Sequence, residues 1–78
     1  MIERDKAIAL ATERMKALPC SSSKFLSAIH SQALEAFDNP ATGWRVWFEV
    51  DDPDFGLYDR PVEVCDATGE ARLVLILL

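Results

Sequence analysis

The sequence has few of the residues from which catalytic and metal sites are built. Among 78 residues there is one histidine, His30, and there are two cysteines, Cys20 and Cys65. Two cysteines are too few for a disulfide scaffold, and a lone histidine has no second histidine with which to hold a metal. No glycine-flanked nucleophile is present. We therefore expect a non-enzymatic protein without cofactor or metal; the alternative is a small thiol-dependent enzyme that uses a cysteine with His30.

Positive charge and long apolar runs are also scarce. The formal net charge is −5, which argues against nucleic acid and against an anionic membrane surface as partners, because both require a basic face. The longest apolar run, Leu73 to Leu78, is far shorter than the roughly 20 residues that span a bilayer. The chain starts with Met1-Ile2 and then charged residues rather than an export signal. We expect a cytoplasmic protein.

What the chain does contain is enough apolar sequence for one small domain over residues 1–78. Half of the residues are hydrophobic and 27% are charged, a composition typical of a globular fold. The clearest pattern runs from Trp44 to Val50, where apolar residues alternate strictly as in a β-strand. One face of this strand would carry the core residues Trp44, Val46, Phe48 and Val50, and the other face would carry Arg45, Trp47 and Glu49.

Residues 3–18 have the spacing of an amphipathic helix. The predicted buried stripe consists of Ile8, Ala11, Met15 and Leu18, flanked by Ala7 and Leu10. Pro19 would stop the helix, and residues 20–24 would form a short polar loop.

Residues 25–38 are ambiguous, because Phe25, Ile29, Ala33 and Phe37 recur every four residues, a spacing that suits both a helix and a strand. The alanine and leucine content favours a helix.

Two prolines and a glycine punctuate residues 51–61, so we expect a long acidic loop with no regular element across it. A strand over 62–65, a turn over 66–69 with Gly69 at positive φ, and a returning strand over 70–78 would follow. The last six residues are apolar on both faces, which indicates a covering layer or a homodimer formed through this C-terminal strand.

The candidate binding residues lie in and before the acidic loop. Trp47, between two charged neighbours on its face, is either an exposed contact residue or is buried under a second layer. The loop carries Asp52 and Asp54 beside Phe55, Leu57 and Tyr58, residue types suited to recognising a protein; alternatively, these last three fold back as a lid on the end of the sheet. The acids do not have the spacing of a calcium loop, since Pro53 lies among them.

Three stretches together resemble known small bacterial α+β domains. They are the Ala7-x-x-x-Ala11 repeat, the run Gly43 to Phe48, and the hairpin Val62 to Glu70, which is similar to the ending of PepSY-type domains. The Gly43-Trp44 pair also resembles small immunity proteins of bacterial toxin systems, which neutralise a toxin by binding it. The resemblance implies a helix on an antiparallel meander, with residues 25–38 closer to a strand, and binding rather than catalysis.

The sequence therefore predicts an α+β fold in which an N-terminal helix packs on an antiparallel meander of three to four strands. The alternative has a second helix at 25–37 and three strands. The predicted function is that of a non-enzymatic protein-binding module, an inhibitor or immunity-type protein whose protein partner is not identified. A structural homodimer subunit is the competing hypothesis.

Overall fold

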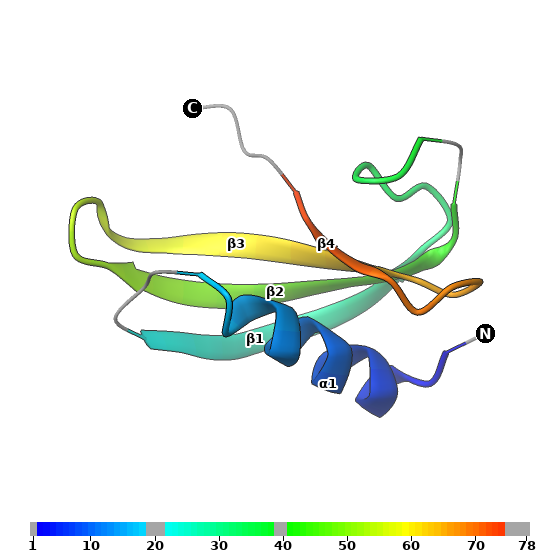
Figure 1. Cartoon of the computed structure of the whole chain (residues 1–78), viewed down its shortest axis with the longest axis horizontal. Helices are drawn as coiled ribbons and strands as arrows, with labels where there is room; N and C mark the ends of the chain where they lie inside the picture. The colour runs from blue at the N-terminus through cyan, green and yellow to red at the C-terminus, as the bar shows by residue number, and fades with distance from the viewer. Residues whose placement is uncertain (1, 19–21, 39–40, 75–78) are drawn as a thin grey trace.

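The computed structural model describes residues 2–18, 22–38 and 41–74, in which one helix packs on a four-stranded antiparallel sheet (Figure 1). The elements follow the chain as α1 (Arg4–Met15), β1 (Ser22–Ser31), β2 (Gly43–Asp52), β3 (Gly56–Cys65) and β4 (Ala71–Leu73). The strands lie in the order β1-β2-β3-β4, so each pairs with its neighbour in sequence. The predicted α+β class with a helix on a meander is confirmed.

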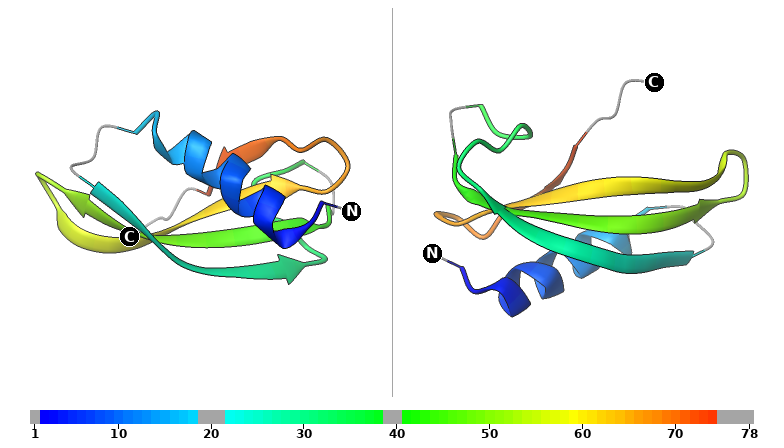
Figure 2. Two further views of the ribbon diagram at one scale, coloured as in Figure 1. Left: turned by 90° about the horizontal axis from the view of Figure 1, so that it is seen from below. Right: turned by 180° about the vertical axis from the view of Figure 1, so that it is seen from behind.

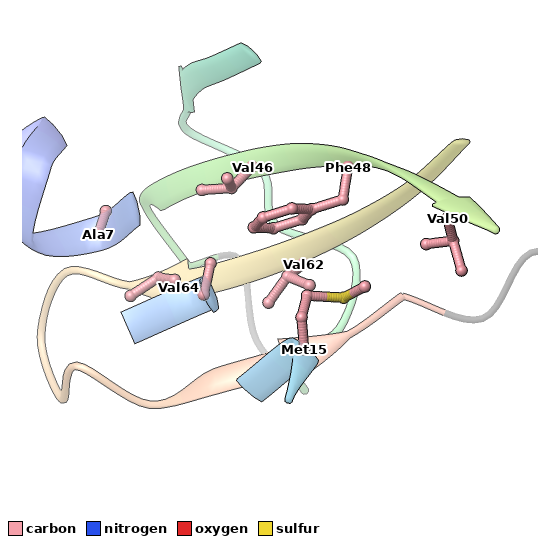
Figure 3. Close-up of a cluster of buried hydrophobic side chains, with 8 residues drawn as sticks. Ala7, Met15, Val46, Phe48, Val50, Val62 and Val64 are labelled. Carbon is pink, nitrogen blue, oxygen red and sulfur yellow. The ribbon is translucent and has the colours of Figure 1, made fainter. Parts of the chain in front are cut away.

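The core lies between α1 and the central strands (Figure 3). Val46, Phe48 and Val50 of β2 point toward the helix, as the alternation predicts, and Trp44 packs partly buried beside them. Val62 and Val64 of β3 complete the sheet side. The helix contributes three buried residues, Ala7, Ala11 and Met15. Small alanines at the contact let the helix axis approach the sheet closely. Ile8 and Leu18 of the predicted stripe are only partly buried, whereas Ala7, predicted to flank it, is fully buried. Leu10, the other flanking residue, is partly buried.

The alternative helix at 25–37 is wrong, because residues 22–31 form β1. This strand pairs antiparallel with β2, with an extra residue, Leu26, between the pairs Phe25↔Phe48 and Ser27↔Trp47. Residues 22–24 of the predicted polar loop therefore belong to β1, and residues 20 and 21 lie outside the described part of the chain. Pairing with β2 outweighs the helix preference of alanine and leucine, because propensity differs by only a few tenths of a kcal/mol per residue.

The long loop predicted over 51–61 is also wrong. The strand β2 continues to Asp52, and β3 begins at Gly56, so that only a short turn connects them. Gly56 takes a φ of 79°, which glycine adopts without strain. Pro61 is tolerated inside β3 because its position faces β4, where the carbonyl of Pro61 accepts a hydrogen bond from Val74 N and no donor is needed.

The predicted turn over 66–69 is confirmed, with Gly69 at a φ of 72°. The returning strand is short, Ala71–Leu73, and residues 75–78 of the strand predicted over 70–78 lie outside the described part of the chain. Cys20 and Pro19 lie outside it as well. Among the described helices, none is both long and apolar enough to cross a membrane.

Candidate functional site

The sheet has an inner face, which packs on α1, and an outer face, which is covered along only part of its length. The outer face carries the alternate residues of each strand, among them Arg45 and Trp47 of β2. The segment after β1, residues 32–38, lies on this side of the sheet, opposite the helix (Figure 2). We call the part under this segment the closed half, and the part toward the β2–β3 turn the open half.

The closed half is organised by Glu63, whose side chain is fully buried. Its Oε1 accepts hydrogen bonds from the backbone N–H groups of Glu35 (2.7 Å) and Ala36 (2.6 Å). Its Oε2 accepts from Nε and Nη2 of Arg45 at 3.0 and 2.7 Å. A carboxylate has about four acceptor positions, so that these four bonds leave none for a ligand or a metal ion. Glu63 therefore has a structural role.

Neighbouring contacts hold the same segment down. Arg72 of β4 donates from Nη1 to the carbonyl of Ala36 (3.0 Å), and its guanidinium lies 4.5 Å from the centre of the Phe37 ring. Leu34 is buried, and its N–H donates to the carbonyl of Ala41 (2.9 Å). Apolar contacts, ionic contacts and backbone hydrogen bonds thus together hold residues 32–38 over the closed half.

On the inner face at the same end of the sheet, His30 meets Asp66. His30 Nε2 lies 2.8 Å from Asp66 Oδ2, and the N–H of Ile2 donates to Oδ1 at 3.1 Å. Burial raises the pKa of Asp66, but the hydrogen bonds from His30 and Ile2 outweigh it and hold that pKa below its ordinary value. Trp44 packs edge-on against His30 and donates from Nε1 to the carbonyl of Ile2 (2.8 Å). These bonds tie the start of the chain to the sheet.

The thiol-enzyme hypothesis pairs His30 with Cys65 or Cys20. The structure does not bring His30 and Cys65 together, and Cys20 lies outside the described residues. His30 is bonded to Asp66 on the inner face, whereas Cys65 lies on the outer face and is buried. A backbone hydrogen bond from Ala67 lowers the pKa of the Cys65 thiol against the opposing effect of burial. Within the described residues, no group of three His, Cys, Asp or Glu side chains is placed to hold a metal.

The open half is acidic and carries exposed apolar side chains. Glu49 and Asp59 are directly opposite each other on β2 and β3, and Asp51 is opposite Leu57 in the adjacent pair of the outer face. Like charges facing one another across a strand pair destabilise a sheet, and here Lys24 is the only described cation paired with either acid. Leu57 is 68% exposed.

The turn at the end of the open half places the remaining predicted residues. Asp52 Oδ1 accepts hydrogen bonds from the N–H groups of Asp54 (2.7 Å) and Phe55 (3.1 Å), which fixes the turn. Phe55 is 81% exposed and does not fold back as a lid. Tyr58 differs from the others, because it lies on the inner face and packs against the core.

Trp47 lies on the outer face where the open half begins. It is half-buried, opposite the buried Pro61 on β3 and Ser27 on β1. Of the residues that the sequence prediction named, Trp47 lies on the outer face and Tyr58 on the inner face, whereas Asp52, Asp54 and Phe55 lie at the β2–β3 turn. Leu57, which the sequence also places among the apolar residues of the acidic stretch, is exposed as well. The sequence prediction missed the Glu49–Asp59 pair, although the alternation of β2 could have placed Glu49 beside Trp47.

A comparison of the chain with protein-family models, with curated proteins and with solved structures finds no match.

Proposed function

We propose that the chain is a non-enzymatic protein-binding module that captures a basic protein through the open half. The observation that carries the proposal is the exposure of Phe55 and Leu57, at 81% and 68%, beside a group of carboxylates. Large apolar side chains that remain exposed on a fixed turn are typical of contact residues. The turn is held by Asp52, so that little conformational entropy is lost when a partner orders it.

The charges select the kind of partner. The Glu49–Asp59 pair is unfavourable in the free protein, and a cationic side chain placed over both would relieve that repulsion. A partner surface with lysines or arginines around an apolar pocket would therefore complement the carboxylates and Phe55 together. Covering such a basic surface is how an acidic inhibitor or immunity-type protein of bacteria would block a target that binds nucleic acid or another anion.

The test is capture by the immobilised chain, compared between two matched double variants. Phe55→Ser with Leu57→Ser removes the exposed apolar residues of the open half, whereas Leu26→Ser with Ile29→Ser removes two exposed ones from β1. We expect the first variant to lose a basic partner that the second still captures, with both variants remaining folded. The partner should be released by salt, because exposed charge pairs are screened. Equal capture by both variants, or a captured protein that is acidic, would refute the proposal.

A further inference from the structure

The outer edge of β1 is unpaired in the described part of the chain, because β2 is the only strand there that pairs with it. An open edge presents backbone N–H and C=O groups that another strand can bind. Three of the five exposed large apolar side chains of the described residues are on this strand: Phe25, Leu26 and Ile29. The edge thus combines free hydrogen-bonding groups with apolar surface.

The hydrogen-bond pattern shows which backbone groups face outward. Val74 N–H donates to the Pro61 carbonyl and Cys65 N–H to the Glu70 carbonyl, so that the odd-numbered residues of β3 face β4. The backbone N–H and C=O groups of successive residues in a strand point to opposite neighbouring strands. The even-numbered residues of β3 therefore bond to β2, where their partners are also even-numbered, and the odd-numbered residues of β2 direct their backbone groups toward β1. The β1 partners of these residues direct their backbone groups toward β2. The other paired residues of β1 direct theirs toward the open edge; these are Ser23, Phe25, Ala28 and His30.

The extra residue Leu26 makes the spacing of these four edge residues irregular, but the spacing is the same when it is taken from either end. Successive outward residues are separated by two, three and two positions. A regular strand, which repeats every two positions, can match the set on only one side of Leu26. A second copy of the chain, turned by a two-fold axis, presents the same steps in reverse order and matches all four residues. In this arrangement Ser23 pairs with His30 of the second copy, and Phe25 pairs with its Ala28.

The distribution of charge also favours a second copy of the chain as the partner of the β1 edge. The chain carries a net charge of −5, yet β1 contains no acidic residue and only one lysine, Lys24. In the two-fold register Lys24 lies opposite Ile29 of the second copy, so that no like charges face each other. We propose that the chain forms a two-fold dimer through the outer edges of two β1 strands, giving one continuous eight-stranded sheet with both helices on the same side.

The register provides the test. Ile29→Lys places two lysines opposite each other twice in the dimer, whereas Ile29→Glu places a glutamate opposite Lys24 twice. In sedimentation across a range of concentrations, we expect the parent chain to dimerise. The dissociation constant should rise roughly tenfold or more for Ile29→Lys and stay near the parental value for Ile29→Glu. Leu57→Lys, on the β2–β3 hairpin, where the residue is 68% exposed against 58% for Ile29, should leave the dissociation constant unchanged.

Hydrogen exchange gives a readout that does not depend on a variant. The amides of Ser23, Phe25, Ala28 and His30 should gain protection as the concentration of the chain rises. A chain that remains monomeric at millimolar concentration would overturn the proposal. A dimer that Ile29→Lys leaves intact would also overturn it, because the contact would then lie elsewhere, for example at the C-terminal strand. Equal weakening by Ile29→Lys and Ile29→Glu would overturn the register and the proposal with it.

Discussion

The two halves of the outer face are built from the same strands, but they use their charged residues in opposite ways. In the closed half Glu63 faces Arg45 and is buried under residues 34–37, and all of its acceptor positions are satisfied. In the open half Glu49 faces Asp59, an arrangement that costs stability in the free protein. A charged residue that is fully satisfied holds the fold, whereas one that is left unfavourable is available to a partner. We interpret the closed half as scaffold and the open half as recognition surface.

Replacing one glutamate in each half should give the largest difference in stability between the two halves. Glu63→Ala leaves Arg45 and the N–H groups of Glu35 and Ala36 without their acceptor, so that we expect a loss of about 3–5 kcal/mol in the free energy of unfolding. Glu49→Ala removes the repulsion from Asp59 together with the attraction to Lys24, its partner on β1, so that stability should change by less than about 0.5 kcal/mol. Urea denaturation of both variants measures the difference. Similar losses would show that the two halves are not distinct.

The two glycines at the ends of β2 and β3 extend the same contrast. A Cβ on Gly43 would lie 1.9 Å from the carbonyl oxygen of Val64 and 2.9 Å from Leu34 Cδ1, so that Gly43→Ala must displace either backbone or the buried Leu34. We expect a cost of about 2–3 kcal/mol. At Gly56 a Cβ meets nothing within 4 Å, and only the positive φ is unfavourable, which should cost about 1 kcal/mol. Thermal unfolding that ranks these variants in the reverse order would contradict the packing described for the closed half.

The bond between Asp66 and His30 should make stability depend on acid. The pKa of Asp66 is lower in the folded protein than its ordinary value of 3.8. Its contribution is therefore complete above the unfolded pKa and is lost as the pH falls through the folded pKa. Asp66→Asn should lower stability by about 1–2 kcal/mol at pH 7 and flatten the decline of the melting temperature below about pH 4. Asp54→Asn, on the exposed turn, should do neither; an unchanged acid profile for Asp66→Asn would refute this role.

The smallest expected effect on stability is at the turn of the open half. Asp52→Ala removes the acceptor for Asp54 N and Phe55 N and should cost about 0.5–1 kcal/mol. It should also weaken capture of the partner, because Phe55 would no longer be held in place. Asp54→Ala keeps the turn while removing one charge, and it serves as the control. If Asp52→Ala binds as well as Asp54→Ala does, the fixed turn is not needed for recognition.

The elements with a strong period could be predicted from the sequence. The stripe of α1 and the alternation from Trp44 to Val50 each have one period, and every side chain that these patterns select packs in or against the core. Ile8, Leu18 and Trp44 are only partly buried there. The stretch that became β1 could not be decided, because its apolar residues recur every four positions. The extra residue Leu26 further disturbs its alternation.

The closed half could not be predicted, because nothing local marks it. Glu63 alternates with valines and therefore looks like a solvent-facing residue; only residues 35 and 36, far away in sequence, reveal that it is buried. Pro61 led to the wrong prediction of a loop for a similar reason. A proline is tolerated at this position of the strand only because the position faces β4, which the sequence does not reveal. The open half was partly predicted, because exposed acids and aromatics near a turn are a local feature. Tyr58 was wrongly grouped with the loop residues, because its stretch was predicted as a loop; as part of β3, it lies on the inner face of the sheet.

The central claim, that the open half binds and the closed half does not, is tested most directly by site-specific photo-crosslinking. A benzophenone amino acid is introduced either in place of Phe55, on the open half, or in place of Phe37, which packs against Arg72 on the closed half. After irradiation with lysate proteins, we expect the label at position 55 to attach a basic protein and the label at position 37 to attach none. Attachment of the same protein from position 37 alone would contradict the claim.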